Sequence, residues 1–334
     1  MNDNKEKHSI SQLRQDLVTG DWVVIATGRG KRPHAFSGNP STVKEPKENC
    51  PFESFAEEGP FVPLLREGSV TVIPNKFPAF ASGVCKVFSK EGPYTFADGV
   101  GFHEVFVLKD HDRYIPDLET EEVKDLVRAY RERYNSIAKQ ECIAYVSVFH
   151  NHGREAGASL AHPHSQLIAI PIIPADVERS VAGSARYLKE HGKCAHCEML
   201  AHELAARSRI IAENEKFVAF VPFASRIAFE VRIFPKAHQH GFGMLKDEDI
   251  SFVADMLKQS LAKLRVGLND PAYNFFIHTA PVGSADAYEH YHWHIEILPR
   301  TSTWAGFELG TSIEISAIAP EDAAEFLRGT ETSK

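Results

Sequence analysis

The chain has 334 residues, of which 43% are hydrophobic and 25% are charged, a composition typical of a globular protein. Its formal net charge of −8 lacks the basic footprint of a general nucleic-acid binder. No apolar run approaches the roughly 20 residues that span a bilayer, so we expect no nucleic acid and no membrane among its partners.

The N-terminal residues and the cysteines bear on where in the cell the protein is expected. The segment 1–12 is polar and lacks the apolar core that a secretion signal requires. Five cysteines form an odd and sparse set, which argues against a disulfide framework. We therefore expect a cytoplasmic protein. Its unusual feature is the 17 histidines, many of them crowded into a few short segments.

The first half of the chain alternates strand patterns with one helix pattern. Residues 34–60 are rich in Pro, Ser, Glu and Gly and indicate a long irregular connection. Apolar residues at helical spacing predict a helix over 120–138. Runs of β-branched and aromatic residues predict strands at 22–26, 70–73, 104–108, 144–149 and 166–173.

The second half repeats this order, with a helix predicted over 247–264 and strands at 217–222, 229–234, 273–278 and 295–298. A shift of 128 residues pairs the two His-x-His segments, matching His162 with His290, His164 with His292, and Pro171 with Pro299. We interpret this pattern as an internal duplication. The predicted fold is α+β, an antiparallel sheet with packed helices built twice, over residues 1–180 and 181–334.

One strand pattern carries the chemistry. Small residues lead into His162-Pro163-His164-Ser165-Gln166, and on a strand residues 162, 164 and 166 share one face. The backbone amides of the preceding turn, 157–159, form a suitable cradle for a phosphate group. A neutral imidazole can attack phosphorus and form a covalent phospho-histidine. This segment is therefore a candidate nucleophile strand.

A C-x-x-C pair, Cys194 and Cys197, suggests a metal site. With His238 and either His290 or His292 downstream, it offers two thiolates and two imidazoles, which satisfy tetrahedral zinc. A redox pair or two inert thiols are the alternatives, but the thioredoxin-like context of a redox pair is missing. The internal repeat nominates His290 as the fourth ligand.

The His-Pro-His-Ser-Gln segment resembles the active-site signature of the galactose-1-phosphate uridylyltransferases, a branch of the histidine triad superfamily. The resemblance runs from about residue 13 to about residue 325. Other similar segments are Arg29-Gly30-Lys31-Arg32-Pro33, Cys50-Pro51-Phe52, Asn75-Lys76-Phe77-Pro78, His103-Glu104-Val105 and Phe149-His150-Asn151. The resemblance implies a duplicated histidine triad fold with half-barrel sheets, and a homodimer.

The resemblance also implies roles for individual residues. His164 is the nucleophile that becomes nucleotidylated, and Gln166 holds the transferred phosphoryl group. The expected substrate-binding residues are Asn75, Asn151 and Ser159 at the nucleotide, and Arg29 and Arg32 at phosphate across the dimer interface. Histidine triad hydrolases place a third histidine where this chain has Gln166. An uncharged amide suits a phosphate-to-phosphate exchange, because neither half-reaction needs strong acid or base assistance.

The implied reaction exchanges UMP between a UDP-hexose and a hexose 1-phosphate, such as UDP-glucose and galactose 1-phosphate, by a ping-pong cycle through nucleotidyl-His164. Two alternatives stay open. One is an ADP-glucose phosphorylase, or one for another nucleoside diphosphate sugar, which uses inorganic phosphate. The other is a nucleotide-binding module without catalysis. Residues 306–311 and the C-x-x-C pair resemble the ADP-glucose phosphorylase branch, and Gly310-Thr311-Ser312 replaces the hexose-binding Gly-Tyr-Glu of bacterial uridylyltransferases.

The resemblance extends to zinc, at one or two structural sites. The ADP-glucose phosphorylase branch nominates His292 rather than His290 at the second site, and we take His292. The family's first site has a Cys-Pro-Phe-Cys segment and two later histidines, which correspond here to Cys50, Glu53, His111 and His162. Glu53 replaces the second cysteine. A carboxylate also ligates zinc, so this site either closes with Glu53 or has decayed.

Overall fold

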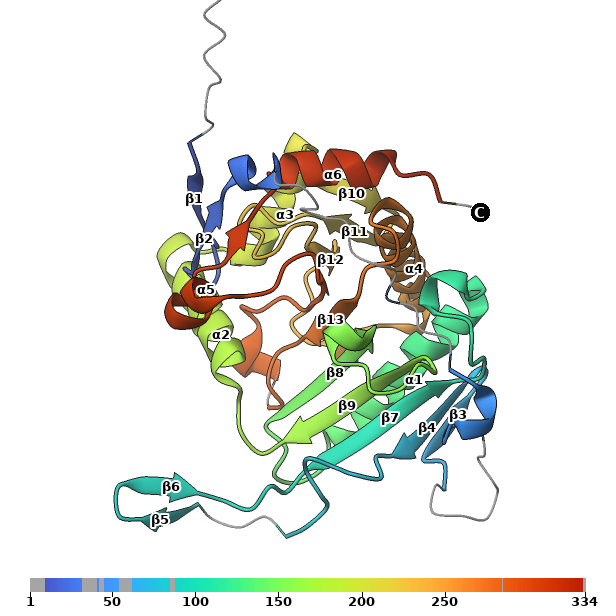
Figure 1. The fold of residues 1–334 in the computed structure, drawn as a ribbon. Coiled ribbons are helices and arrows are strands. Elements are labelled where there is room, and N and C mark those ends of the chain that lie inside the picture. The colour runs from blue at the N-terminus through green and yellow to red at the C-terminus, as the bar shows by residue number, and fades with distance from the viewer. Residues whose placement is uncertain are drawn as a thin grey trace, which may run out of the picture.

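The structure, a computed structural model, describes residues 10–31, 41, 45–53, 62–84, 88–283 and 285–332. Its centre is an open sheet of ten strands, each antiparallel to its neighbours (Figure 1). From edge to edge the order is β10 (Ile210–Glu213), β11 (Phe217–Phe220), β12 (Val231–Pro235), β14 (His294–Pro299), β13 (Tyr273–His278), β8 (Tyr145–His152), β9 (His164–Ile170), β7 (Phe102–Leu108), β4 (Val70–Pro74) and β3 (Leu65–Glu67). The predicted antiparallel α+β class is confirmed.

The strand order is symmetric about the junction of β8 and β13. On each side of this junction the chain forms three strands of the sheet, one long helix and two further strands. The two halves therefore have the same topology, as the internal duplication predicts. At the junction, Asn151 of β8 lies opposite Asn274 of β13. The expected division between residues 180 and 181 falls inside α2 (Ala175–His191).

The predicted offset of 128 residues between the halves is wrong by two. In β9, His164 Nδ1 lies 2.8 Å from the carbonyl oxygen of His162. In β14, His294 Nδ1 lies 3.2 Å from the carbonyl oxygen of His292. His162 and His164 therefore correspond to His292 and His294, a shift of 130. Because side chains alternate with a period of two, a two-residue error leaves each histidine on the expected face.

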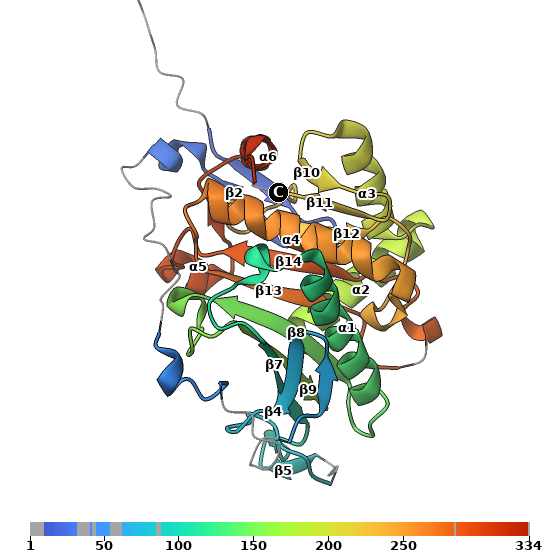
Figure 2. The same cartoon turned by 90° about the vertical axis from the view of Figure 1, so that its right-hand side faces the viewer.

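Two long helices, α1 (Thr120–Ile137) and α4 (Ile250–Gly267), cover one face of the sheet (Figure 2). Their apolar residues recur at helical spacing, and Leu126 and Leu257 are completely buried in the main core. Both predicted helices are confirmed. The long second helix begins three residues later than predicted, because residues Asp247–Asp249 form a short 3-10 turn. The opposite face of the sheet carries the functional side chains.

Smaller elements surround the sheet. The N-terminal strands β1 (Gln12–Gln15) and β2 (Trp22–Ile25) form a separate sheet with β15 (Ile315–Ser316) near the C-terminus. The peripheral helices are α2, α3 (Ala195–Ala206), α5 (Gly306–Thr311) and α6 (Pro320–Gly329). A hairpin of β5 (Ser89–Glu91) and β6 (Tyr94–Phe96) projects from the body (Figure 1).

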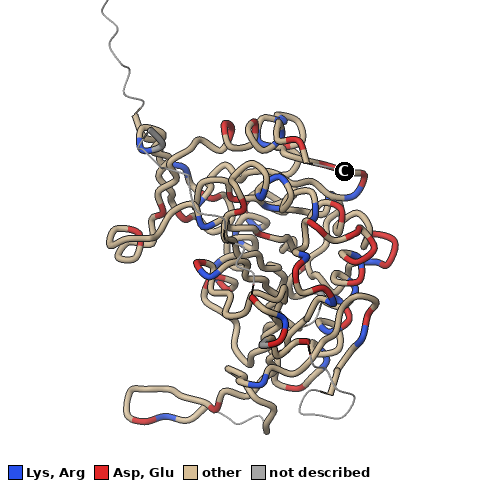
Figure 3. The backbone as a smooth tube through the Cα atoms, turned by 45° about the vertical axis from the view of Figure 1, so that its right-hand side comes forward, with Lys and Arg blue, Asp and Glu red and all other residues tan. Residues whose placement is uncertain are grey.

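Charges are distributed along the whole molecule. Basic and acidic residues are interspersed on most elements in the view of Figure 3. Within the part of the chain that the structure describes, no helix has the length and apolar character needed to cross a membrane.

Helix α2 packs so closely against the N-terminal segment that there is no room for a side chain at position 183. A Cβ added to Gly183 would lie 1.8 Å from the carbonyl oxygen of Val18. We expect Gly183→Ala to lower the free energy of unfolding by about 1–3 kcal/mol, the usual cost of overpacking. Gly329→Ala in α6 is the matched control, because an added Cβ there meets no heavy atom within 4 Å. Urea unfolding compares the two variants, and equal midpoints would contradict the prediction.

Candidate active site

Strand β9 sorts its residues onto two faces. Ser165 points towards α1, where its Oγ lies 2.5 Å from Tyr130 Oη and 2.8 Å from His150 Nδ1. His164 and Gln166 lie on the open face, as the strand period predicts. His150 is buried, and burial holds the pKa of its imidazole well below the usual value. These hydrogen bonds fix β9 and the ring of His150, which also borders the pocket described below.

The imidazole of His164 has one orientation. Its Nδ1 donates a hydrogen bond of 2.8 Å to the carbonyl oxygen of His162, so Nε2 carries the lone pair. The side chain is 7% exposed. Burial lowers the pKa of His164, and the neighbouring His162 imidazole lowers it further, against the opposing effect of the hydrogen bond. The ring is therefore neutral with Nε2 unprotonated, which is the form in which an imidazole can act as a nucleophile.

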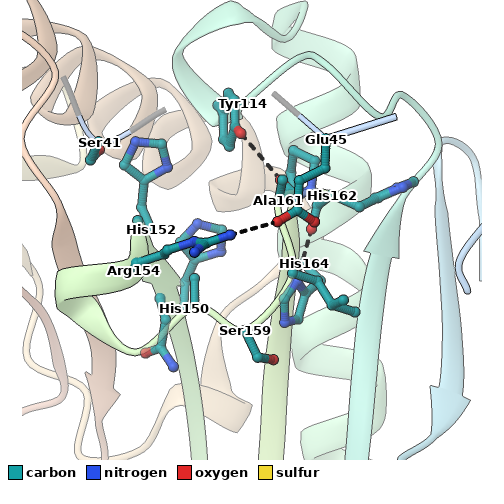
Figure 4. A pocket seen from close by; sticks show the side chains of 15 residues that line it. Ser41, Glu45, Tyr114, His150, His152, Arg154, Ser159, Ala161, His162 and His164 are labelled. Atoms are coloured by element: carbon teal, nitrogen blue, oxygen red, sulfur yellow. Dashed lines mark hydrogen bonds and ion pairs between the residues drawn. The ribbon is translucent and has the colours of Figure 1, made fainter. Parts of the chain in front are cut away.

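A pocket opens beside His164 (Figure 4). It is lined by Asn151, His162, His164 and the loop that precedes β9, including Ala158 and Ser159. Tyr114 Oη donates to the carbonyl oxygen of Ala161 at 3.1 Å and fixes this loop. Arg154 reaches across the opening to Glu45, with Nη2 and Oε1 3.0 Å apart.

A chain of side chains orients Asn151. Arg300 Nε donates to Asn274 Oδ1 at 2.7 Å, and Asn274 Nδ2 donates to Asn151 Oδ1 at 2.7 Å. The oxygen of Asn151 is thereby occupied, which leaves its amide nitrogen as the group that faces the pocket. The sequence interpretation missed Asn274 and Arg300, because both belong to the second half of the chain and carry no motif.

Two further predicted residues, Asn75 and Gln166, meet at a third residue. Gln166 Oε1 lies 2.7 Å from His103 Nε2, and Asn75 Nδ2 lies 3.0 Å from the same nitrogen. The sequence alone assigns no role to His103, which belongs to the family-like segment His103-Glu104-Val105. His103 reaches Gln166 because β7 pairs with β9, and no residue spacing in the sequence specifies this pairing.

Of the two predicted arginines, the structure describes only Arg29, which stands apart from these residues. Arg29 is exposed on a short 3-10 helix, Thr27–Lys31, that follows β2, and it does not line the pocket. Arg32 lies outside the described residues. A single chain therefore brings His164, Asn151 and Ser159 together, and joins Gln166 to Asn75, without placing Arg29 beside them.

The four residues of the first predicted metal group lie together. Ligand atoms of its four residues all lie within 4.8 Å of one another, and the residues are Cys50, Glu53, His111 and His162. His111 Nδ1 and His162 Nδ1 are 3.1 Å apart, and Glu53 Oε1 is 3.0 Å from the former.

The hydrogen bonds of the two imidazoles fit a cation at this place. His111 Nε2 donates to the carbonyl oxygen of Glu45 at 2.9 Å, and His162 Nε2 donates to that of Leu108 at 2.7 Å. Both Nδ1 lone pairs therefore face each other and the Glu53 carboxylate. A metal ion held by His111, His162 and Glu53 would be coordinated by these lone pairs and would remove their mutual repulsion.

The second predicted group has the same design, with Cys194, Cys197, His238 and His292. Cys197 Sγ lies 3.3 Å from His238 Nδ1 and 3.7 Å from His292 Nδ1. These separations match the ligand spacing of about 3.3–3.8 Å around tetrahedral zinc. His238 Nε2 donates to the carbonyl oxygen of Glu289 at 2.7 Å. The group includes His292 and not His290, so the register of 130 residues, rather than 128, agrees with it.

A third group, His278, His294 and Glu296, lies where the second half repeats the nucleophile. Burial alone would raise the pKa of Glu296, but Arg226 and Arg232 hold it well below the usual value. Both guanidinium groups form ion pairs with this carboxylate. Their positive charges disfavour a cation, so we assign no metal to this group.

Comparison with known proteins addresses the family. A model described as galactose-1-phosphate uridyl transferase, N-terminal domain, matches residues 1–174, and a domain of unknown function (DUF4921) matches residues 108–328. ADP-glucose phosphorylase of Arabidopsis thaliana is 34% identical over 328 residues, covering 95% of this chain and 92% of that protein. Galactose-1-phosphate uridylyltransferase of Thermotoga maritima is 30% identical over 329 residues, covering 96% and 98%.

Solved structures agree. An ADP-glucose phosphorylase from Arabidopsis thaliana with bound ADP-glucose has a TM-score of 0.81 at 32% identity, covering 97% of this chain and 100% of that chain. A uridylyltransferase structure has a TM-score of 0.76 at 28% identity, covering 96% and 97%. The duplicated sheet with its His-x-His strand defines an enzyme of the nucleotidyltransferase type. The chain belongs to the galactose-1-phosphate uridylyltransferase family and shares features with its ADP-glucose phosphorylase branch.

Removal of single ligands tests both metal groups. We expect the purified chain to carry two zinc ions, Glu53→Ala to lose one, and Cys197→Ser to lose the other. Glu53→Cys should keep both, because a thiolate also suits zinc. Inductively coupled plasma mass spectrometry measures zinc per chain. Glu48→Ala, an exposed acidic neighbour, is the control. Unchanged zinc content in Glu53→Ala would exclude Glu53 as a ligand.

Proposed function

We propose that the chain transfers a nucleoside monophosphate from a nucleoside diphosphate hexose to a phosphate acceptor, through a covalent intermediate on His164. The observation that carries this proposal is the fixed orientation of the His164 imidazole. Its Nδ1 donates a hydrogen bond to the His162 carbonyl, which leaves Nε2 as the nucleophile. Its whole-length relatives include enzymes named for reactions of galactose 1-phosphate and ADP-glucose.

The two half-reactions balance without an external proton donor. His164 Nε2 attacks the α-phosphorus, an N–P bond forms, and the P–O bond to the β-phosphate breaks to release hexose 1-phosphate. A phosphate oxygen of the acceptor then attacks the same phosphorus, and the N–P bond breaks to restore neutral His164. The leaving group of the first half-reaction is the hexose 1-phosphate anion, and that of the second is the neutral imidazole of His164. Neither needs a proton to depart, so general acid assistance is unnecessary.

Rate acceleration then comes from positioning and from donors to the phosphoryl oxygens. We assign this role to the amide nitrogens of Gln166 and Asn151 and to the backbone amides around Ser159. It is supported by Asn151 and Ser159, which line the pocket, and by Gln166, which follows His164 on the same face of β9. Zinc at the two metal groups would be structural. There it would join the Cys50 loop to His162, and α3 to the strand of His294.

UMP exchange between UDP-hexose and hexose 1-phosphate is the first candidate. It is supported by the family match to the segment that contains the nucleophile and by uridylyltransferases among the full-length relatives. ADP-glucose phosphorolysis is the second candidate. It is supported by the 34% identity to the plant phosphorylase and by the structure with bound ADP-glucose. The segment of α5, which resembles that branch, supports it as well.

We also propose a homodimer in which Arg29 and Arg32 of one subunit bind phosphate in the site of the other. The exposed position of Arg29, away from the pocket of its own chain, supports this arrangement. Cytoplasmic location stays a prediction.

Intact-protein mass tests the covalent step. We expect the chain to gain one UMP or one AMP residue when mixed with UDP-glucose or ADP-glucose without an acceptor. His164→Asn should abolish the adduct and lower turnover by about 10³-fold or more. His202→Asn, exposed on α3, is the control and should behave like wild type. Retained turnover in His164→Asn would exclude the mechanism.

The acceptor that discharges the adduct distinguishes the two candidates. Galactose 1-phosphate should remove a uridylyl group if the chain is a uridylyltransferase, with UDP-galactose as product. Inorganic phosphate should remove an adenylyl group if it is a phosphorylase, with ADP as product. Chromatography of the released nucleotide identifies the product. Absence of an adduct with both donors would count against transfer by these donors and favour a binding module.

A further inference from the structure

His103 joins two of the predicted substrate-binding amides. It lies on β7, and its ring is within hydrogen-bond distance of three groups: Ala79 N at 3.1 Å from Nδ1, and Gln166 Oε1 and Asn75 Nδ2 at 2.7 Å and 3.0 Å from Nε2. Neither His103 nor Gln166 lines the pocket beside His164, but Gln166 lies two residues after His164 on the same face of β9. His103 can therefore act on the reaction through the amide of Gln166.

The contact with Ala79 determines the tautomer of His103. A backbone amide nitrogen can only donate, so Nδ1 must accept through its lone pair. The ring is then neutral and carries its proton on Nε2. The Nε2 nitrogen lies 2.7 Å from Gln166 Oε1, which accepts its proton.

This hydrogen bond selects one orientation of the Gln166 amide. If the amide were rotated by half a turn, its NH₂ group would face the N–H of His103, and two donors would oppose each other. With Oε1 held by His103, the NH₂ group points away from it. No hydrogen bond from this nitrogen to another residue is found within the described ranges, so its donors are available to a ligand.

Asn75 follows the same rule. Its Oδ1 accepts from the backbone N–H of Phe77 at 2.8 Å, which fixes the orientation of this amide. Its Nδ2 lies 3.0 Å from His103 Nε2, which is a contact between two donors and not a hydrogen bond when Nε2 carries the proton. The two hydrogen bonds that hold the His103 ring are therefore those with Ala79 N and Gln166 Oε1.

We propose that His103 is a positioning residue, which holds the amide of Gln166 with its donors towards the transferred phosphoryl group. This inference rests on the proposed nucleotidyl transfer. An amide free to rotate would present its carbonyl oxygen to an anionic phosphoryl group in part of the molecules, and that dipole would oppose the transition state. Donors fixed in advance avoid this cost at the moment of reaction.

Two substitutions of His103 separate positioning from packing. His103→Leu removes the donor, and we expect the rate of nucleotidyl-His164 formation at saturating donor to fall about 10- to 100-fold, less than loss of a direct oxyanion donor. His103→Gln places an amide nitrogen near the position of Nε2 and should restore the rate to within about threefold of wild type. Rapid quench followed by mass spectrometry measures the rate.

A matched control and a double variant complete this kinetic test. His278→Leu removes another half-buried histidine from the same face of the sheet and should leave the rate within about twofold. In a Gln166→Ala background, His103→Leu should add less than about a twofold effect, because residues that act through one another are not additive. Full additivity, or failure of His103→Gln to restore the rate, would show that His103 acts through packing alone and overturn the proposal.

A spectrum that needs no activity tests the same residue. In ¹⁵N-labelled histidine spectra of the whole chain, the signals lost in His103→Gln should be those of a neutral ring protonated on Nε2. A ring protonated on Nδ1 would overturn the relay even in an active enzyme. Failure of the wild-type chain to form an adduct with either donor would count against the proposed function, and the tautomer would still decide the orientation of Gln166.

Discussion

The hydrogen bond from His164 Nδ1 to the carbonyl oxygen of His162 is the interaction on which the site depends. It leaves Nε2 unprotonated and aims it at the pocket. The carbonyl belongs to a residue whose own ring is held at Nε2 by Leu108 and at Nδ1 by the first metal group. The start of β9, the first metal group and the ring of His164 are therefore linked by direct contacts. A shift of the Cys50 loop would move the acceptor that determines the tautomer of His164.

The second half contains the same hydrogen bond in different electrostatic surroundings. His294 is bonded to the carbonyl of His292, which belongs to the second metal group. The position of Gln166, however, is taken by Glu296, a buried carboxylate paired with Arg226 and Arg232. An anion at that position would repel a phosphoryl group, and the two arginines are already engaged. The two halves thus share one backbone frame and differ at this position in the charge of one side chain and in its partners.

Much of the fold and part of the site could be predicted from the sequence. Period-two and period-3.6 patterns located the main strands and helices, and the strand period placed His164 and Gln166 on one face. The register between the halves was wrong because a shift of two residues preserves the face of every side chain. His103 and Asn274 were missed for another reason. Each acts through a neighbouring strand, and a contact between β7 and β9, or between β8 and β13, leaves no spacing in the linear sequence.

The junction of β8 and β13 limits how the duplicated chain can be divided. Asn151, in the half that holds the nucleophile, is oriented by Asn274 and Arg300 from the other half. A fragment that ended after the first repeat would also leave the backbone groups of β8 unpaired along one edge. The second half therefore supplies both the side chains that orient Asn151 and the strand that pairs with β8. The two repeats share one sheet, so separating them would remove contacts that each repeat cannot make alone.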